Sequence, residues 1–307
     1  MPTTTVVCLP DENAVEMLGP LPDGVEVVVW DGSGPHPDRL EETTFWVPQV
    51  EDADSLDDKF AALPALKVVQ LTSAGVEDVL AHVPRGVTLC NARGVHGSSV
   101  AELLLTMVLA SLRQLPHFLD AQRASRWDLV EGEDLRDKRV LIVGAGDLGD
   151  ETAKRLRAFD AVPVLVAHSA RNGVHATDEL PDLLPTADVV VITVPLTPAT
   201  TGMVDAAFLR QMQDGAMLVN VARGKVVDTD ALLAELTSGR LRAGLDVVDP
   251  EPLPSDHPLW QAPGLILTPH AAGHVKQAGP RAFALVAKQL RRFVAGDDLV
   301  NVVGEAY

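Results

Sequence analysis

Arg223, Glu251 and His270 carry the groups with the clearest chemistry in this sequence, and each follows a short apolar stretch. A guanidinium can hold a carboxylate that lies beside a ketone through paired hydrogen bonds. An imidazole can give a proton to the ketone oxygen as a hydride arrives, and a carboxylate on its other nitrogen orients the ring. The charged groups also stabilise the negative charge that develops on oxygen. These residue types predict reduction of a 2-keto acid, although each residue alone is also typical of a structural role.

A glycine-rich segment, VLIVGAGDLG, predicts where the hydride donor binds. Four apolar residues lead into Gly144, Gly146 and Gly149, and an amphipathic helical pattern follows at once. The first glycine permits a sharp turn, the second lets a pyrophosphate approach the backbone, and the third lets the helix pack close to the strand. The helix start offers N–H groups and the positive end of its dipole to the phosphates. This order favours a dinucleotide site over an ordinary glycine-rich turn.

The residues after the next apolar strand indicate which dinucleotide binds. NAD-dependent enzymes with this glycine pattern usually carry an acidic residue there, which binds the ribose 2′-hydroxyl. Here the strand is followed by His168, Ser169 and Arg171, with no carboxylate among residues 166–171. Arg171 can pair with a 2′-phosphate while Ser169 donates a hydrogen bond. We therefore expect NADP to be the preferred cofactor, with NAD as the alternative if Arg171 is a solvated loop residue.

The composition indicates a globular chain that binds neither nucleic acid nor membranes. The 307 residues are 47% hydrophobic, and the formal net charge of -18 repels phosphate backbones and anionic lipids. Cys8 and Cys90 are the only cysteines, and they have neither metal-binding nor disulfide spacing. No apolar run reaches 18 residues, and the N-terminus lacks a signal-peptide pattern. We therefore expect a cytoplasmic protein without a metal site.

Apolar runs alternate with amphipathic runs, which predicts an α/β fold with parallel sheets. The predicted strands are residues 4–9, 25–30, 45–50, 66–71, 87–91, 140–143, 162–167, 189–194, 216–221, 241–247 and 265–268. Besides the helix after the glycines, the predicted helices are residues 56–62, 76–80, 99–111, 116–126, 179–184, 205–212, 229–238 and 279–295. Helix 99–111 is apolar almost all round, which indicates burial between domains or subunits. Ser99 and Glu102 form a predicted capping box at its start.

Two α/β units are predicted, one from residues 1–95 together with 275–307 and one from residues 96–274. The last helix has no strand of its own to return to, so we expect it to pack on the first unit and make that unit discontinuous. A single boundary near residue 140 is the alternative. Trp46 lies in the first unit, where it is either a core residue or part of a substrate mouth.

Five segments follow one another along the chain: VGAGDLG, VPLTPATTGMV, LVNVARGKVVD, GLDVVDPEPLP and LILTPHAAG. Because of these segments and their order, the sequence resembles the D-isomer-specific 2-hydroxyacid dehydrogenase family over about residues 70–275. The resemblance implies two Rossmann-like domains, one flavodoxin-like and one NAD(P)-binding, with parallel sheets and a cleft between them. It implies reduction of a 2-keto acid of the glyoxylate or hydroxypyruvate type to the D-2-hydroxy acid with NAD(P)H. It also implies a homodimer formed through the nucleotide domain, which fits the apolar helix 99–111.

The resemblance assigns roles to individual residues. It implies a catalytic triad of Arg223, Glu251 and His270, with His270 as the general acid, and a contact from Asp246 to the nicotinamide carboxamide. Substrate binding is predicted for the backbone N–H groups of Ser73, Ala74, Gly75 and Val76, together with Arg223 and His270. Cofactor binding is predicted for Gly144, Gly146, Asp147, Leu148, Gly149, His168, Ser169, Arg171, Val194, Pro195, Thr200, Val221, Ala222, Asp246, His270 and Gly273.

Departures from related patterns narrow the expected activity. Glu251 disfavours formate oxidation, the lack of a Tyr in residues 93–96 disfavours lactate or pyruvate, and the end at Tyr307 leaves no room for the regulatory domain of long phosphoglycerate dehydrogenases. An NAD(P)-sensing corepressor on the same fold is the alternative, which the acidic surface and the absence of a long disordered tail disfavour. A nicotinamide enzyme acting on amino acids or nucleosides accounts for the glycine turn but not for the later segments.

Overall fold

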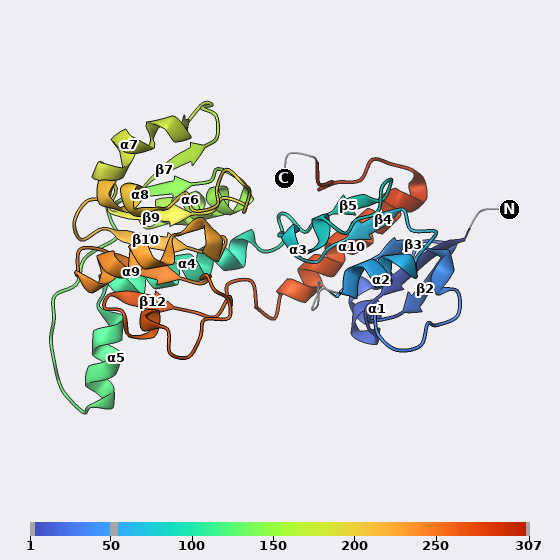
Figure 1. The fold of residues 1–307 in the computed structure, drawn as a ribbon, viewed down its shortest axis with the longest axis horizontal. Coiled ribbons are helices and arrows are strands. Elements are labelled where there is room, and N and C mark those ends of the chain that lie inside the picture. The colour runs from blue at the N-terminus through green and yellow to red at the C-terminus, as the bar shows by residue number, and fades with distance from the viewer. Residues whose placement is uncertain (1–3, 50–54, 305–307) are drawn as a thin grey trace. The chain divides into compact units, whose positions relative to one another are not determined.

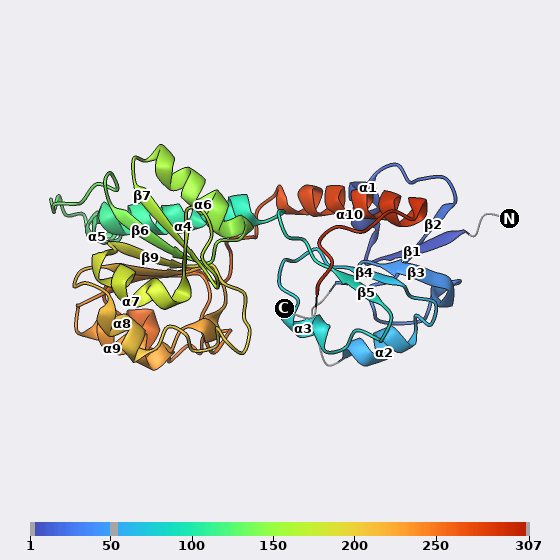
Figure 2. The ribbon, with the colours of Figure 1, turned by 90° about the horizontal axis from the view of Figure 1, so that it is seen from above.

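The computed structural model describes residues 4–49 and 55–304, and the chain divides into two compact units. Unit 1 comprises Met1–His96 and Lys276–Tyr307, and unit 2 comprises Gly97–Val275, so neither boundary lies near residue 140. Each unit is built on one parallel sheet with helices on both faces, as Figures 1 and 2 show. The predicted α/β fold with two parallel sheets is confirmed.

Unit 1 is a five-stranded sheet in the order β2-β1-β3-β4-β5. Its strands are β1 (Thr5–Leu9), β2 (Val25–Val29), β3 (Thr43–Trp46), β4 (Val68–Gln70) and β5 (Thr88–Cys90). Its helices are α1 (Glu12–Leu18), the short η1 (Leu40–Glu42), α2 (Leu56–Ala61), α3 (Glu77–Leu80) and α10 (Ala278–Ala295). Helices α1 and α10 cover one face of this sheet, and α2 and α3 cover the other (Figure 2).

Side chains of β1 alternate between the two cores of unit 1, as the two-residue repeat of a strand requires. Val7 contributes to the core beneath α1 and α10, whereas Cys8 contributes to the core beneath α2 and α3. Burial raises the pKa of the Cys8 thiol to about 12, so this cysteine remains protonated and unreactive. Trp46 is 2% exposed and packs edge-on against Phe60, which makes it a core residue.

Helix α1 and strand β3 of unit 1 differ from the sequence prediction, and the short η1 was not predicted either. Helix α1 was not predicted, although Asp11 precedes it and its carboxylate accepts a hydrogen bond from the Ala14 N–H, which is a standard helix-start signal. The strand predicted at residues 45–50 instead runs from Thr43 to Trp46. Pro48 lies beyond its end, where a residue without an N–H is tolerated. Val50, the last residue of that prediction, lies outside the described residues.

Unit 2 is a seven-stranded sheet in the order β12-β11-β10-β9-β6-β7-β8. Its strands are β6 (Arg139–Val143), β7 (Val162–Ala167), β8 (Val174–Ala176), β9 (Val189–Ile192), β10 (Met217–Asn220), β11 (Arg242–Leu245) and β12 (Leu265–Leu267). Its helices are α4 (Gly97–Leu112), α5 (Leu115–Arg123), α6 (Asp147–Ala158), η3 (Thr177–Glu179), α7 (Leu180–Leu183), η4 (Leu184–Thr186), α8 (Ala206–Gln211), η5 (Gly224–Val226), α9 (Thr229–Thr237) and η6 (Pro258–Gln261).

The chain order reverses beside β6, because β7 and β8 extend the sheet to one side and β9 to β12 extend it to the other. Open parallel sheets bind ligands at the carboxyl ends of the strands where such a reversal occurs. The glycine turn follows β6 and therefore lies at this point. Helices α4 and α6 cover one face of the sheet, and α7, α8 and α9 cover the other (Figure 2).

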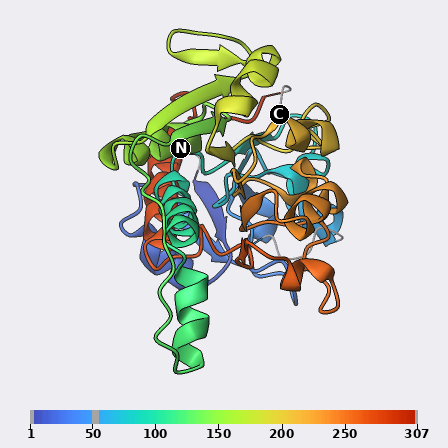
Figure 3. The ribbon, with the colours of Figure 1, turned by 90° about the vertical axis from the view of Figure 1, so that its left-hand side faces the viewer.

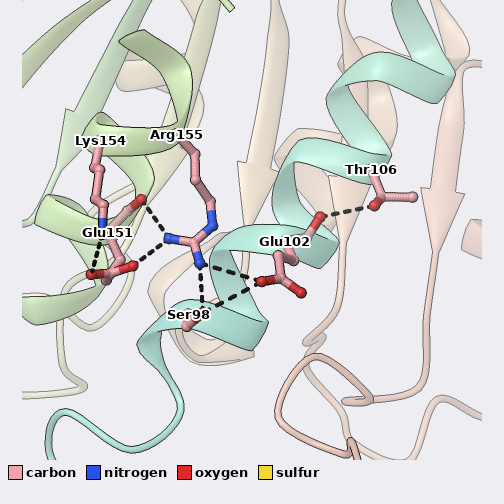
Figure 4. A network of polar contacts seen from close by, with 6 residues as sticks. All are labelled: Ser98, Glu102, Thr106, Glu151, Lys154 and Arg155. Carbon is pink, nitrogen blue, oxygen red and sulfur yellow. Dashed lines mark hydrogen bonds and ion pairs between the residues drawn. The ribbon is translucent and has the colours of Figure 1, made fainter. Parts of the chain in front are cut away.

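Helix α4 is apolar because much of its surface is buried within unit 2, where it packs against α6, β10 and β11. A polar network on its first turns joins it to α6, as Figure 4 shows. The guanidinium of Arg155 donates to Ser98 Oγ at 2.5 Å and also pairs with Glu151 and Glu102. The hydrogen bond from Arg155 holds the pKa of Glu151 below its usual range. The network fixes α6 and therefore the position of the glycine turn.

The predicted capping box at Ser99 is wrong, because α4 already begins at Gly97. A Cβ on Gly97 would overlap the carboxylate of Asp147, which lies against this helix start. Helix α5 follows α4 and projects from unit 2 (Figures 1 and 3). Within residues 4–49 and 55–304, no single helix is long and apolar enough to cross a membrane. Helices α4 and α5 meet that test only as a pair bent by 69°.

Candidate active site

The glycine turn after β6 has the geometry that a bound pyrophosphate requires. Gly144 has φ +121°, and a Cβ there would meet the backbone of Thr193 at 2.7 Å. A Cβ on Gly149 would overlap the Gly144 carbonyl, so the start of α6 can approach the turn only without a side chain. At Gly146 a Cβ would meet no atom within 4 Å, which leaves this stretch of backbone open to a ligand. The residues present fit a dinucleotide, whose phosphates the N-terminus of α6 would hold.

Arg171 comes from the loop after β7 and reaches back to the glycine turn. Its Nη2 donates to the Ala145 carbonyl at 2.6 Å, and its backbone pairs with Val174. His168 and Ser169 are exposed in the same loop. The structure therefore brings a guanidinium beside the glycine turn, across 26 residues of sequence.

The other predicted cofactor residues of unit 2 lie at the same sheet edge, because each follows a parallel strand. Val194 and Pro195 follow β9, and the Thr200 hydroxyl donates to the Pro195 carbonyl at 2.6 Å, which closes that loop. Val221 and Ala222 are buried after β10. The remaining positions are Asp147 and Leu148 at the start of α6, Asp246 after β11 and Gly273 after β12.

Arg223 is held by a buried amide at the end of β10. Asn220 is fully buried; its Nδ2 donates to the Arg223 carbonyl at 2.9 Å, and its Oδ1 accepts from the Ala222 N–H at 3.1 Å. The Arg223 guanidinium donates to the Ala222 carbonyl at 2.8 Å. A Cβ on the next residue, Gly224, would overlap the Val248 carbonyl, so this turn packs directly on the chain that leads to Glu251.

His270 and Glu251 meet as the sequence analysis expects. The imidazole Nδ1 lies 2.6 Å from Glu251 Oε1, and both side chains remain partly exposed, at 49% and 39%. With Nδ1 engaged by the carboxylate, Nε2 is the nitrogen left to carry a proton to a substrate. His270 has φ +52°, in the left-handed region that few residues other than glycine adopt.

Asp246 holds the strained backbone at His270. Its carboxylate accepts hydrogen bonds from the Thr268 hydroxyl at 2.5 Å and from the N–H groups of Ala271 and Ala272 at 2.8 and 3.0 Å. The His270 N–H donates to the Asp246 carbonyl at 2.7 Å. With Asp246 only 2% exposed, these bonds make it a support for the His270 loop. Its contact with a nicotinamide carboxamide stays a prediction.

The sequence did not predict that Asn220 and Asp246 hold the loops of the site by hydrogen bonds. Asn220 falls within a predicted apolar strand, and the resemblance gives Asp246 only a contact with the cofactor. The signal for Asn220 is a single amide at the end of AMLVNV, since a buried polar side chain needs hydrogen-bond partners. Within residues 4–49 and 55–304, no three His, Cys, Asp or Glu side chains gather closely enough to hold a metal ion.

The segment Ser73–Val76 belongs to unit 1 and follows β4. Ser73 and Ala74 are exposed, and Val76 is buried at the start of α3. The Ser73 hydroxyl donates to the Gly75 carbonyl at 2.9 Å and closes a tight turn. Backbone N–H groups are the donors that the prediction requires for a carboxylate, and their contact with a substrate stays a prediction.

Comparison with known proteins places the chain in a family. Residues 105–272 match the model of the D-isomer specific 2-hydroxyacid dehydrogenase NAD binding domain. A D-3-phosphoglycerate dehydrogenase of Mycobacterium tuberculosis is 35% identical and aligns with 97% of this chain, which in turn spans only 59% of that relative. A glyoxylate reductase of Thermofilum pendens is 34% identical over 80% of this chain and 76% of its own length.

Solved structures agree over nearly the whole chain. An NADPH-dependent glyoxylate/hydroxypyruvate reductase from Sinorhizobium meliloti, in complex with NADP and sulfate, has a TM-score of 0.84 and 27% identity over 99% of both chains. A 2-hydroxyacid dehydrogenase from Xanthobacter autotrophicus Py2, in complex with NADPH and MES, has a TM-score of 0.83 and 30% identity over 98% of this chain and 99% of its own. The resemblance drawn from five motifs is confirmed, and the chain belongs to the D-isomer specific 2-hydroxyacid dehydrogenase family.

Proposed function

We propose that this protein reduces a small 2-keto acid of the glyoxylate or hydroxypyruvate type to the D-2-hydroxy acid, with NADPH as the reductant. The observation that carries the proposal is the 2.6 Å pairing of His270 with Glu251, at the sheet edge that also presents Arg223 and the glycine turn. Membership of the family supports the reaction class. The glyoxylate reductase and the glyoxylate/hydroxypyruvate reductase among the similar proteins support the choice of substrate.

In the proposed mechanism each residue has a separate task. Arg223 binds the substrate carboxylate and holds the adjacent ketone in place. His270 donates the proton from Nε2 to the ketone oxygen, and Glu251 stabilises the charged imidazole and fixes its orientation. The backbone N–H groups of Ser73–Val76 provide further donors to the carboxylate. Bound NADPH supplies the hydride, so that the carbonyl becomes a secondary alcohol or, from glyoxylate, a primary one.

The choice of NADPH rests on Arg171 and on the absence of a carboxylate in the residues that follow β7. The guanidinium of Arg171 lies beside the glycine turn through its bond to Ala145, and residues 166–171 contain no carboxylate to repel a 2′-phosphate. His168 and Ser169 are exposed in the same loop and available to the ribose. NADPH or NADP is the nucleotide bound in both solved structures named above.

Replacing Arg171 by alanine is expected to raise the KM for NADPH about 10- to 100-fold while changing the KM for NADH less than twofold. The reason is that a charge-assisted hydrogen bond to a phosphate contributes roughly 1.5–3 kcal/mol, and NADH lacks that phosphate. Arg157→Ala, on the exposed last turn of α6, serves as the matched control. Equal losses with both nucleotides would contradict the assignment.

We also propose a homodimer, formed in part through the segment that follows α4. Leu115 and Leu119 on α5 are 45% and 41% exposed, and Trp127 and Leu129 beyond it are 103% and 87% exposed. Apolar side chains gathered on one projecting segment are typical of a protein interface. A second copy is the partner that the family resemblance implies.

The double substitution Trp127→Ser and Leu129→Ser is expected to convert a dimer of twice 32.7 kDa into the monomer, because it removes the two most exposed apolar side chains of the segment. Sedimentation equilibrium measures the mass directly. Trp260→Ser, which removes a half-exposed tryptophan elsewhere in unit 2, should leave the mass unchanged. A wild-type monomer, or a double variant that remains dimeric, would refute this interface.

A panel of 2-keto acids tests the proposed function. Glyoxylate, hydroxypyruvate, pyruvate and 3-phosphohydroxypyruvate are each mixed with the protein and NADPH, then with NADH. The expected result is the highest kcat/KM for glyoxylate or hydroxypyruvate with NADPH. A preference for 3-phosphohydroxypyruvate would instead align the protein with its phosphoglycerate dehydrogenase relatives. Tight NADPH binding without turnover of any substrate would favour a nucleotide-sensing protein.

A further inference from the structure

The loop before α3 has its carbonyl groups turned toward one segment of unit 1. Three consecutive carbonyls, those of residues 72–74, accept hydrogen bonds from the segment 91–96. The donors are His96 Nε2 to Thr72 O at 2.8 Å, the Ala92 N–H to Ser73 O at 2.7 Å, and Asn91 Nδ2 to Ala74 O at 2.8 Å.

This arrangement fixes the direction of the loop's N–H groups. In a trans peptide the N–H of one residue points opposite to the carbonyl of the residue before it. With the carbonyls of residues 72–74 directed toward segment 91–96, the N–H groups of Ser73, Ala74 and Gly75 are directed away from it. A run of N–H groups on one side of a curved loop forms a concave site for an anion.

Asn91 is a buried side chain that donates to this loop. It is 6% exposed, and its Oδ1 accepts from the Arg93 N–H at 3.2 Å, so both ends of its amide are engaged. Its carbonyl accepts from Gln70 Nε2 at 3.2 Å. Gln70 in turn accepts from Gln289 of α10 at 2.9 Å, and both glutamines are fully buried.

A chain of buried amides therefore runs from α10 through β4 to the end of β5 and on to the loop. Buried amides whose donors and acceptors are all used are rigid, because breaking any one bond leaves a polar group unpaired away from water. The loop itself is exposed at Ser73 and Ala74. The donors of segment 91–96 therefore help to fix its conformation, together with the Ser73–Gly75 hydrogen bond inside the loop.

We propose that Asn91 is a positioning residue for substrate binding, which holds the Ala74 carbonyl so that the neighbouring N–H groups face the substrate carboxylate. The inference rests on the proposed function, because that function makes Ser73–Val76 a carboxylate site. Asn91 itself does not touch the substrate. It acts through the loop, and His96 acts in the same way on the Thr72 carbonyl, two peptides earlier.

Asn91→Ala is expected to raise the KM for hydroxypyruvate about tenfold, since the variant loosens N–H groups that bind a charged carboxylate. The KM for NADPH and kcat should stay within twofold, because the substitution leaves His270 and the glycine turn of unit 2 unchanged. Asn301→Gly is the matched control, because glycine adopts the left-handed φ of +55° at this position without strain. Asn301 donates to the Arg93 carbonyl at 2.9 Å in the same region, without any bond to the loop in the described structure. Its kinetics should match those of the wild type.

Binding of oxalate provides a measurement that does not need turnover, so it separates this inference from the proposed function. Calorimetry should show weaker oxalate binding by Asn91→Ala than by the wild type and by Asn301→Gly. His96→Leu, which removes the donor to Thr72 from a half-buried position, is the second variant if Asn91→Ala does not fold. Unchanged hydroxypyruvate KM and oxalate affinity, or equal effects in the two asparagine variants, would overturn the inference. A wild type that binds oxalate but reduces no keto acid would refute the proposed function alone.

Discussion

Replacing His270 by glutamine is expected to lower kcat for the 2-keto acid by about 10²–10⁴-fold, the usual contribution of a positioned general acid. Glutamine keeps a polar side chain of similar length but cannot deliver a proton from a cationic ring. The KM for NADPH should change less than threefold, because the glycine turn and Arg171 are left intact. Steady-state kinetics with saturating NADPH gives both values.

The chain offers a matched control for this variant. His274 lies four residues further along the same loop and is exposed, so His274→Gln should retain wild-type kcat. Glu251→Gln tests the orienting partner. It should lower kcat less than His270→Gln does, since an amide oxygen can still accept the hydrogen bond from Nδ1 but stabilises the charged ring less. A His270→Gln protein with wild-type activity would contradict the proposed mechanism.

Replacing Arg223 by glutamine is expected to lower kcat/KM for the keto acid by about 10³-fold or more. Loss of a charge-assisted pair to the carboxylate weakens binding, and loss of positive charge near the reacting oxygen removes a further 10²–10³-fold of transition-state stabilisation. The fall should appear in both KM and kcat. Arg223→Lys should recover only part of the activity, because an ammonium group cannot form the paired geometry of a guanidinium.

Lys225→Gln is the control for this prediction, since Lys225 is an exposed cation two residues away in the same turn. Both variants lose one positive charge from a chain of net charge -18, so a general electrostatic effect on anionic substrates would reduce their activities alike. A large loss of activity confined to Arg223→Gln indicates that Arg223 binds the substrate carboxylate directly. Similar small losses in the two variants would contradict the role given to Arg223.

The sheet of unit 2 was predictable because buried parallel strands are nearly continuous apolar runs. Strands β6, β7, β9, β10, β11 and β12 all overlap predicted ranges. The exception is β8 (Val174–Ala176), a three-residue edge strand that is only half-buried. Its sequence has too few apolar residues to be distinguished from a loop, and its pairing with β7 supplies the rest of its stability.

The paired side chains of the site were predictable only through the ordered motifs. Glu251 and His270 lie 19 positions apart in the sequence, and nothing in that spacing shows that their side chains meet at 2.6 Å. The supports for these side chains were harder to foresee. Asn220, Asp246 and Asn91 act through hydrogen bonds to loops, and in the cases of Asp246 and Asn91 those loops are distant in sequence. A lone polar residue at the end of an apolar strand is the available signal, and it does not identify its partner.

The product of hydroxypyruvate reduction tests the central claim most directly. Wild-type protein, NADPH and hydroxypyruvate are incubated to completion, and the glycerate formed is quantified on a chiral column beside the NADPH consumed. We predict D-glycerate in a one-to-one ratio with oxidised NADPH. Formation of L-glycerate, or no NADPH oxidation with any 2-keto acid of the panel, would contradict it.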